Sequence, residues 1–322
     1  MAPMSIAPRI SNKIANMSLV CAILVVGLHC KADFVQGSMV LFAWKILVQV
    51  FGAIAVPFFF VISGFLLAGH MHEKKWWVRE NLKRIRTLLV PYVCSCIVFI
   101  ALEFGLKLLA NITSHQDLWR NFDFSCGYWL QAFGVDLRFN PINAPLWYVR
   151  ALLVLVGLSF FVKRLAIGVG VSLLLFLYVV SCFCFIRIDN DNWVCRECLV
   201  SLDAVKALFY FTSGVFLRLR AGFLFSHFHR PLIYSLTVGL FVALVFLLLN
   251  ESPYFGRACW LFVPFGGCVI FDLMPSRKWP SELTSLSFPI YIFHTAIIQV
   301  VGVILRESAP FVAEAMKRSM SV

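Results

Sequence analysis

Nine stretches of the sequence are apolar over roughly the length that a helix needs to cross a bilayer, about 20 residues for a hydrocarbon core of about 30 Å. Hydrophobic residues make up 61% of the 322 residues and charged residues 14%, against about 25% charged in a typical soluble domain. The sequence therefore predicts one all-α domain over residues 1–322, a polytopic membrane bundle of about nine or ten transmembrane helices. The expected spans are 14–30, 46–69, 87–109, 145–162, 166–186, 202–217, 231–250, 257–273 and 284–305.

The distribution of Lys and Arg predicts the orientation of these spans. With the N-terminus in the cytoplasm, the inner segments carry more than half of the 28 Lys and Arg residues, among them the run KKWWVRENLKRIR. We therefore expect a multi-pass protein of a bacterial inner membrane with a cytoplasmic N-terminus. The net charge of +12 is explained by this orientation and by contact with membrane lipids, so nucleic acid is not an expected partner.

Most of the 11 cysteines lie within the apolar stretches, where cysteine is usually a small hydrophobic residue. Cys195 and Cys198 form a single CxxC pair in an expected outer loop, and a disulfide between them or to Cys126 is one alternative. A zinc site would need two more ligands, and the sequence offers no second pair. We expect no metal.

A few polar residues fall inside the expected spans, where an ionisable side chain costs about 2.5–3.5 kcal/mol and usually faces a protein interior or a wet cavity. His29 and Arg150 lie near the expected outer ends of their spans, whereas Ser63 and Gly64 lie in the inner half of theirs. Tyr291 and His294 are three residues apart and share one face of the ninth span with Ser287. Together these residues favour a polar-lined cavity.

Each of these residues also has a purely structural interpretation. His29 could be an interfacial histidine, and Arg150 could extend to the outer headgroups. Ser63 and Gly64 could allow two helices to approach closely, as small residues do in membranes. Tyr291 and His294 could belong to a satisfied hydrogen-bond network between helices.

The basic run after the second span has two interpretations as well. Orientation and binding of anionic lipid explain it from charge alone. A binding site for a polyanionic cytoplasmic cofactor is the functional interpretation, and it favours the residues that lead into the third span, which are Lys83, Arg84 and Arg86.

Five motifs occur in an order that resembles the bacterial membrane acyltransferase type 3 family: AILVVGLH, VPFFFVISGFLL, LKRIRTLLVPY, PLWYVRALL and LSFPIYIFHT. The resemblance covers about residues 13–300, and the second motif and the histidine of the first are its most specific parts. The family includes enzymes that O-acetylate surface polysaccharides, peptidoglycan and lipid-linked sugars. The resemblance implies an O-acyltransferase that uses cytoplasmic acyl-CoA, acetyl-CoA above all, to modify a glycan or a lipid-linked sugar beyond the membrane.

The resemblance also implies roles for particular residues. His29 matches the essential histidine of the family's first helix and would be the general base for the acceptor hydroxyl. Arg150 would orient the acceptor or stabilise the developing oxyanion. Lys83, Arg84 and Arg86 would bind the phosphates of CoA, and the wall of the acyl-donor passage would be formed by Ser63, Gly64, Tyr291 and His294.

The sequence departs from the family pattern in two places. The family usually has Arg or Lys eleven residues before the histidine, where this chain has Ser18, and Lys13 lies five residues earlier. The last helix of the family is expected to be absent or reduced to a short amphipathic segment after residue 305.

Two other functions fit the same polar residues. A transporter or flippase for a lipid-linked sugar would line a translocation path with them, although the chain lacks the paired broken helices of many transporters. A non-catalytic member of a polysaccharide assembly complex would suit the two departures from the family pattern.

Overall fold

The computed structural model describes residues 6–30, 38–114, 125–135, 141–168, 172, 175–176, 202–219, 230–252 and 254–320. These residues form helices and connecting turns, with no strand among them, so the all-α class is confirmed. The predicted span 166–186 lies largely outside the described residues, as do Cys195 and Cys198.

In the first half of the chain, short π-helical and 3₁₀ segments interrupt the α-helices. They are α1 (Pro8–His29), α2 (Met39–Lys45), η1 (Ile46–Phe51), η2 (Gly52–Ile54), α3 (Ala55–Ala68), α4 (Trp76–Arg84), η3 (Ile85–Leu89), α5 (Val90–Ser114) and α6 (Cys126–Ala132).

The second half is built in the same way. Its elements are η5 (Ala144–Leu146), α7 (Trp147–Gly157), α8 (Ser159–Gly168), α11 (Leu202–Leu219), α13 (Arg230–Leu249), α14 (Phe255–Leu273), α15 (Ser281–Thr284) and α16 (Ser287–Met320).

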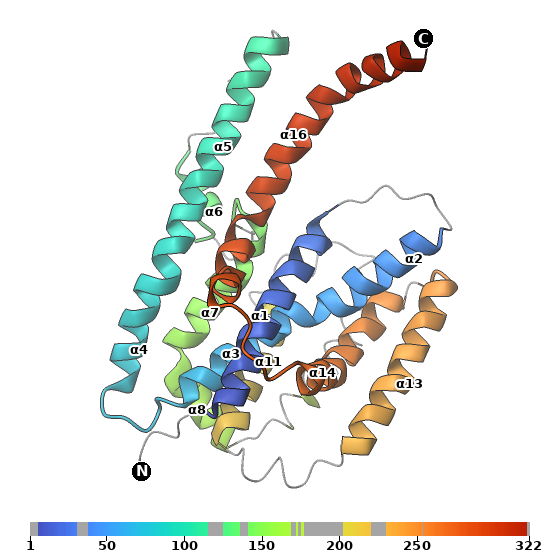
Figure 1. Cartoon of the computed structure of the whole chain (residues 1–322). Helices are drawn as coiled ribbons and strands as arrows, with labels where there is room; N and C mark the ends of the chain where they lie inside the picture. The colour runs from blue at the N-terminus through green and yellow to red at the C-terminus, as the bar shows by residue number, and fades with distance from the viewer. Residues whose placement is uncertain are drawn as a thin grey trace.

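Helix α1 lies in the middle of the bundle, with the long rod of α4 and α5 on one side and the pair α13 and α14 on the other (Figure 1). It packs mainly on α16 and α3. Helices α5 and α16 continue well beyond the end of α1 (Figure 1). Helix α1 ends at His29.

Five helical segments are long and apolar enough to cross a membrane, and a sixth is added if a bent pair counts as one span: Pro8–His29, Met39–Ala68, Trp76–Leu108, Arg230–Leu249, Ser287–Ile304, and the pair Ala144–Gly157 with Ser159–Gly168. The described residues thus support a polytopic membrane bundle but do not give the predicted count of nine or ten. Helix α14 has 19 residues, of which Ala258–Leu273 count as a shorter apolar helix. Charged residues lower the hydropathy of α11, among them Lys206 and Arg218.

The predicted span 145–162 falls on a bent pair of helices, because the chain bends by 75° between α7 and α8. The helix ends at Gly157, and Leu158 leaves the helical region with φ −85° and ψ 5°. The indole of Trp77 donates a hydrogen bond to the Gly157 carbonyl at 3.0 Å. This bond satisfies a carbonyl that the break would otherwise leave without a partner.

Two prolines explain why the second and third spans are not regular α-helices. Pro57 lies near the start of α3, directly after the π-helix η1 and the 3₁₀ turn η2, and Pro91 lies near the start of α5, directly after the π-helix η3. A proline removes one backbone donor and clashes with the preceding turn, so the helix must be rewound there. Both spans continue through the irregular turns.

The tightest crossing in the bundle joins α3 and α11 through two glycines. A Cβ atom on Gly64 would lie 2.1 Å from the carbonyl oxygen of Phe211, and one on Gly214 would lie 1.9 Å from the carbonyl oxygen of Val61. Gly64 is buried. Gly64 therefore has the helix-packing role that the sequence analysis gave as the alternative, and its predicted place in the wall of a passage stays a prediction.

We predict that Gly64→Ala and Gly214→Ala each lower the apparent unfolding temperature in detergent. The expected loss in the free energy of unfolding is at least about 1–3 kcal/mol, because an added methyl group must push two backbones apart. The matched control is Gly105→Ala in α5, where no heavy atom lies within 4 Å of the added Cβ. An unfolding temperature for either crossing variant equal to that of the control would contradict the close packing.

Candidate functional site

His29 from the end of α1 meets His294 from α16, although the two residues are far apart in the sequence. Their imidazole rings have centroids 5.0 Å apart and are tilted by 47°. His29 is exposed, whereas His294 has an exposed fraction of 2%. The pair thus combines one histidine that a solute can reach with one that is held inside the protein.

Hydrogen bonding fixes the tautomer of neutral His294. Its Nδ1 lies 2.7 Å from the backbone carbonyl oxygen of Tyr291, and a carbonyl can only accept, so Nδ1 carries the proton. The Nε2 atom is then a lone-pair acceptor. It is buried and has no hydrogen-bond partner in the described part of the chain. A buried acceptor without a partner costs about 1–3 kcal/mol, so this atom is available for a bound group.

The α16 segment that carries His294 is anchored by Asn143, which precedes η5. The buried side-chain amide of Asn143 donates to Ser95 Oγ of α5 at 3.0 Å and to the Ile292 carbonyl at 2.9 Å. Its oxygen accepts a hydrogen bond from the Thr295 hydroxyl at 2.8 Å. Three helical segments are therefore joined by one side chain directly beside His294.

Tyr291 provides a second anchor on the same face of α16. Its hydroxyl donates to the Pro145 carbonyl at 2.5 Å. Pro145 lies in the 3₁₀ turn that begins α7, where carbonyl oxygens lack complete helical partners. The hydrogen-bond network that the sequence analysis gave as an alternative is thus present around Tyr291, and it positions His294.

A row of aromatic side chains leads from this pair toward α3. The Tyr291 ring lies 5.4 Å from the Tyr148 ring in an edge-to-face arrangement, and both rings contact Phe59 at 5.9 Å. The Tyr148 hydroxyl lies 3.4 Å from Ser63 Oγ. Ser63 and Tyr291 are therefore joined through Tyr148 within the packed core, and their predicted role as the wall of a passage stays a prediction.

Arg84 lies at the far end of this row. Its guanidinium is within electrostatic range of the Tyr148 hydroxyl, and its Nε atom is buried without a hydrogen-bond partner among the described residues. Lys83 and Arg86 are exposed. Neighbouring positions on a helix point in directions about 100° apart, so the three basic residues do not converge on one point. The structure turns Arg84 inward and leaves the other two at the surface.

Arg79 in the same basic run is already paired. It forms ion pairs with Glu73 and, at 3.8 Å, with Glu80. Hydrogen bonds from Arg79 and from His70 lower the pKa of Glu73 to about 2, so the carboxylate stays ionised at any physiological pH. Part of the basic charge is therefore neutralised within the protein, whereas the Nε atom of Arg84 has no hydrogen-bond partner among the described residues.

Arg150 is tied to a different part of the molecule. Its Nη1 donates to the Gly134 carbonyl at 3.0 Å, just after α6, and the Tyr92 hydroxyl donates to the neighbouring Phe133 carbonyl at 2.8 Å. Gly134 has φ +62°, a conformation that favours glycine. Among the described residues, no hydrogen bond links Arg150 with His29, so its predicted catalytic role stays a prediction.

Neither of the two residues at the departure from the family pattern faces His29. The Ser18 hydroxyl donates to the Ile14 carbonyl of its own helix at 2.8 Å. The Lys13 ammonium donates to the Asp272 carbonyl at 2.6 Å, at the C-terminal end of α14. Lys13 thus holds α1 against α14 and does not replace the basic residue that the family usually has.

Three functional candidates were missed by sequence reasoning, namely Asn143, Tyr148 and Lys206. Asn143 had no signal of its own, since an asparagine in a polar stretch is usual. Tyr148 lies in the motif PLWYVRALL, where a tyrosine near the end of an expected span is usually an interfacial residue. Lys206 lies inside a predicted span, and a lysine there is by itself a reason to suspect a site.

The geometry does not bring together a metal site. No three His, Cys, Asp or Glu side chains gather closely enough to hold an ion within the ranges that the structure describes. The reaction that the resemblance implies needs a cation to bind the phosphates of the acyl donor. It also needs a base to take the proton of the acceptor hydroxyl. Arg84 and the His29–His294 pair fit these needs, with Tyr148 and Tyr291 between them.

Comparison with known families gives one match, which covers nearly the whole chain. The sequence model of the acyltransferase type 3 family, described as an acyltransferase domain, matches residues 16–315. No curated protein and no solved structure matches significantly. The matched range includes both His29 and His294.

We predict that Asn143→Asp loosens α16, because a carboxylate oxygen would replace the amide donor facing the Ile292 carbonyl. The expected cost is at least about 1–3 kcal/mol of stability, with faster hydrogen exchange in the segment around His294. Asn250→Asp is the matched control, because the Asn250 amide is exposed and donates to the Phe246 carbonyl, a contact within one helix. Unchanged exchange in α16 would show that Asn143 is not the anchor.

Proposed function

Because the chain belongs to the acyltransferase type 3 family and is a membrane acyltransferase, we propose that it moves an acyl group, acetyl in particular, from cytoplasmic acyl-CoA to a hydroxyl of an extracytoplasmic glycan or lipid-linked sugar. The observation that carries the proposal is the meeting of His29 with buried His294. One imidazole is open to a substrate, and the other presents an unpartnered acceptor atom beside it.

In the proposed reaction His29 is the general base. Its imidazole takes the proton of the acceptor hydroxyl as the hydroxyl oxygen attacks the thioester carbonyl carbon. A new C–O bond forms, the C–S bond breaks, and the departing CoA thiolate receives the proton from the imidazolium. The products are an ester and free CoA, and no other reactant is needed.

His294 is assigned as a positioning residue for this base. A neutral imidazole with its lone pair on Nε2 can accept a hydrogen bond from the N–H group of His29. Such a bond would fix the tautomer of His29 and leave its other nitrogen free to take a proton. The separation of 5.0 Å between ring centroids supports this assignment.

The acyl donor would approach from the cytoplasmic side. Arg84 would bind a phosphate of CoA, with the exposed Lys83 and Arg86 adding long-range attraction at the surface. The acyl-pantetheine arm would follow Ser63, Tyr148 and Tyr291 toward His29. Charge-assisted hydrogen bonds are stronger where water is excluded, and Arg84 is partly buried with a buried Nε atom, so it would carry most of the binding.

We predict that His29→Ala abolishes transfer of the labelled acetyl group from acetyl-CoA to candidate glycans by the purified protein. A positioned general base contributes about 10²–10⁴-fold, so at most about a hundredth of the rate should remain. His72→Ala is the matched control, because His72 is an exposed histidine in the turn before α4. Full transfer by His29→Ala would overturn the mechanism. Wild-type protein that transports a glycan across vesicles without acylating it would indicate the flippase instead.

Arg84→Gln should raise the KM for acetyl-CoA about 10–100-fold with a smaller effect on kcat, because a hydrogen bond to a charged group contributes about 1.5–3 kcal/mol. Lys278→Gln provides the control, since Lys278 is an exposed lysine in the loop after α14. Equal KM values for the two variants would remove Arg84 from the donor site.

A further inference from the structure

Helix α4 carries three side chains on the face that it turns to α7. Trp77, Glu80 and Arg84 are spaced by three and four residues, so they lie along one side of the helix. The Trp77 indole donates to the Gly157 carbonyl at the end of α7. Arg84 lies within electrostatic range of the Tyr148 hydroxyl, at the start of α7. Glu80 therefore lies between these two contacts, on the side of Arg84 that is away from Tyr148.

The carboxylate of Glu80 is buried and only partly satisfied. The exposed fraction of the residue is 2%. Its Oε1 atom forms an ion pair with Arg79 Nε at 3.8 Å, a separation too long for a hydrogen bond. Its Oε2 atom is buried and has no hydrogen-bond partner within the described part of the chain. A buried carboxylate oxygen without a donor destabilises a folded protein, so such an oxygen points to a ligand that donates to it.

Glu80 and Arg84 do not neutralise each other, although their spacing favours a pair. A glutamate four residues before a basic residue is a favourable arrangement for a helical ion pair. Of the described residues, only Arg79 is within ion-pair distance of Glu80. The Nε–H group of Arg84 is buried without an acceptor among these residues. One turn of α4 thus presents an open acceptor and an open donor, which a ligand with an anionic group next to a hydroxyl would satisfy together.

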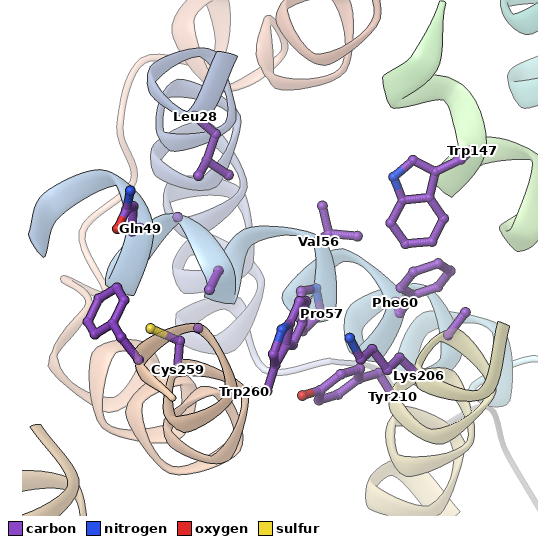
Figure 2. Close-up of a pocket in the computed structure, with 15 residues that line it drawn as sticks. Leu28, Gln49, Val56, Pro57, Phe60, Trp147, Lys206, Tyr210, Cys259 and Trp260 are labelled. Carbon is purple, nitrogen blue, oxygen red and sulfur yellow. The ribbon is translucent and has the colours of Figure 1, made fainter. Parts of the chain in front are cut away.

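A cavity elsewhere in the bundle offers a different chemical environment. It has a volume of about 480 Å³ and lies between the end of α1, the turns η1 and η2, the start of α3, and the helices α11 and α14 (Figure 2). Leu28 and Phe60 belong to its mostly apolar lining, and neither Glu80 nor Arg84 lines it. Phosphates and hydroxyls would lose hydrogen bonds against such walls. The polar end of an acyl donor is therefore matched better by α4 than by this cavity.

We propose that Glu80 is a specificity-determining residue of the donor site, where its Oε2 atom accepts a hydrogen bond from the 2′-hydroxyl of the CoA ribose. The inference rests on the proposed function, in which Arg84 binds a phosphate of acyl-CoA. The ribose of CoA carries this hydroxyl directly beside its 3′-phosphate, so one nucleotide presents both groups to one turn of the helix. The 3′-phosphate would then be the phosphate at Arg84.

The direction of the aromatic row supports this order of contacts. The row formed by Tyr148 and Tyr291 begins at Arg84, and the acyl-pantetheine arm would follow it. Glu80 lies one helical turn from Arg84 on the opposite side, which leaves it for the nucleotide end of the donor. An acyl group on the phosphopantetheine of a carrier protein has no nucleotide and would leave Oε2 without a partner. Glu80 would therefore select acyl-CoA against carrier-bound acyl groups.

Binding of CoA and of 2′-deoxy-CoA to the full-length protein in nanodiscs tests the contact directly. The wild-type protein should bind CoA about 10–100-fold more tightly than 2′-deoxy-CoA, because the difference is one hydrogen bond to a charged group. Glu80→Met should lose this preference and bind both ligands equally, whereas Glu80→Gln, which keeps an acceptor oxygen, should retain part of it. Equal affinity of the wild-type protein for the two ligands, or an unchanged preference in Glu80→Met, would overturn the proposal.

Arg79→Gln is the matched control, because it breaks the same ion pair and leaves the Oε2 atom of Glu80 in place. It should keep the preference for CoA. Since Arg79 is exposed, Glu80→Met leaves no buried charge behind, so it should not lower the unfolding temperature of the protein without ligand. A lowered unfolding temperature together with equally weakened binding of both ligands would assign Glu80 a structural role and overturn the proposal.

Failure of this inference is distinguishable from failure of the proposed function, because the binding measurements need no acyl transfer. A preference for CoA that Glu80→Met abolishes, in a protein that acylates no acceptor, would overturn the transferase mechanism and leave the nucleotide contact. Acyl transfer by the wild-type protein at equal kcat/KM from acetyl-CoA and from acetyl-phosphopantetheine would overturn the role of Glu80 and leave His29 as the base.

Discussion

The side-chain amide of Asn143 is the interaction on which the candidate site depends most directly. It satisfies two donors and one acceptor within a buried space, and its partners lie on α5 and α16. A buried amide with all its partners in place stabilises one arrangement of the helices, since any shift leaves polar atoms unpaired. The cost of such unpaired atoms is higher in a bilayer, where water cannot replace a lost partner. Asn143 and Tyr291 fix the position of α16, and α16 packs against α1, so the meeting of His29 and His294 depends on this anchoring.

The sequence was sufficient to predict that the protein is a membrane helical bundle and to identify the polar residues within its apolar spans. The apolar runs predicted a membrane bundle, and the rule that polar residues in such runs are informative selected both His29 and His294. It did not predict that they would meet, because depth and helix rotation depend on tertiary contacts such as that of Tyr291 with Pro145. Composition counts apolar residues but does not detect a bend, so the break after Gly157 was missed. Gly64 shows the same limit, because its role depends on Gly214 of α11, a partner that no local pattern reveals.

The direction in which Arg84 points illustrates why a charge run alone is ambiguous. Six basic residues within thirteen positions are explained from charge alone by orientation and lipid binding, and cofactor binding was the alternative. In the structure Arg79 is neutralised by Glu73, Lys83 and Arg86 are exposed, and the Nε of Arg84 is buried. An exposed Lys or Arg interacts with anionic headgroups mostly as a point charge, whereas a buried guanidinium requires a specific partner. Burial thus separates the one residue suited to a defined ligand from the residues suited to a membrane surface.

The exposure of His29 and the burial of His294 have a chemical consequence for acyl transfer. A general base must be reachable by the acceptor hydroxyl, and it must also remain neutral until the proton moves. An exposed imidazole meets the first requirement, and apolar surroundings such as the cavity wall at Leu28 favour the second, since burial disfavours the charged form. A thioester that reached His29 in open water would be exposed to hydrolysis. An acceptor bound at His29 would displace water from the exposed imidazole. On this arrangement, acceptor binding itself completes the dry environment in which transfer competes with hydrolysis, so acyl-CoA cleavage should depend on the acceptor being bound.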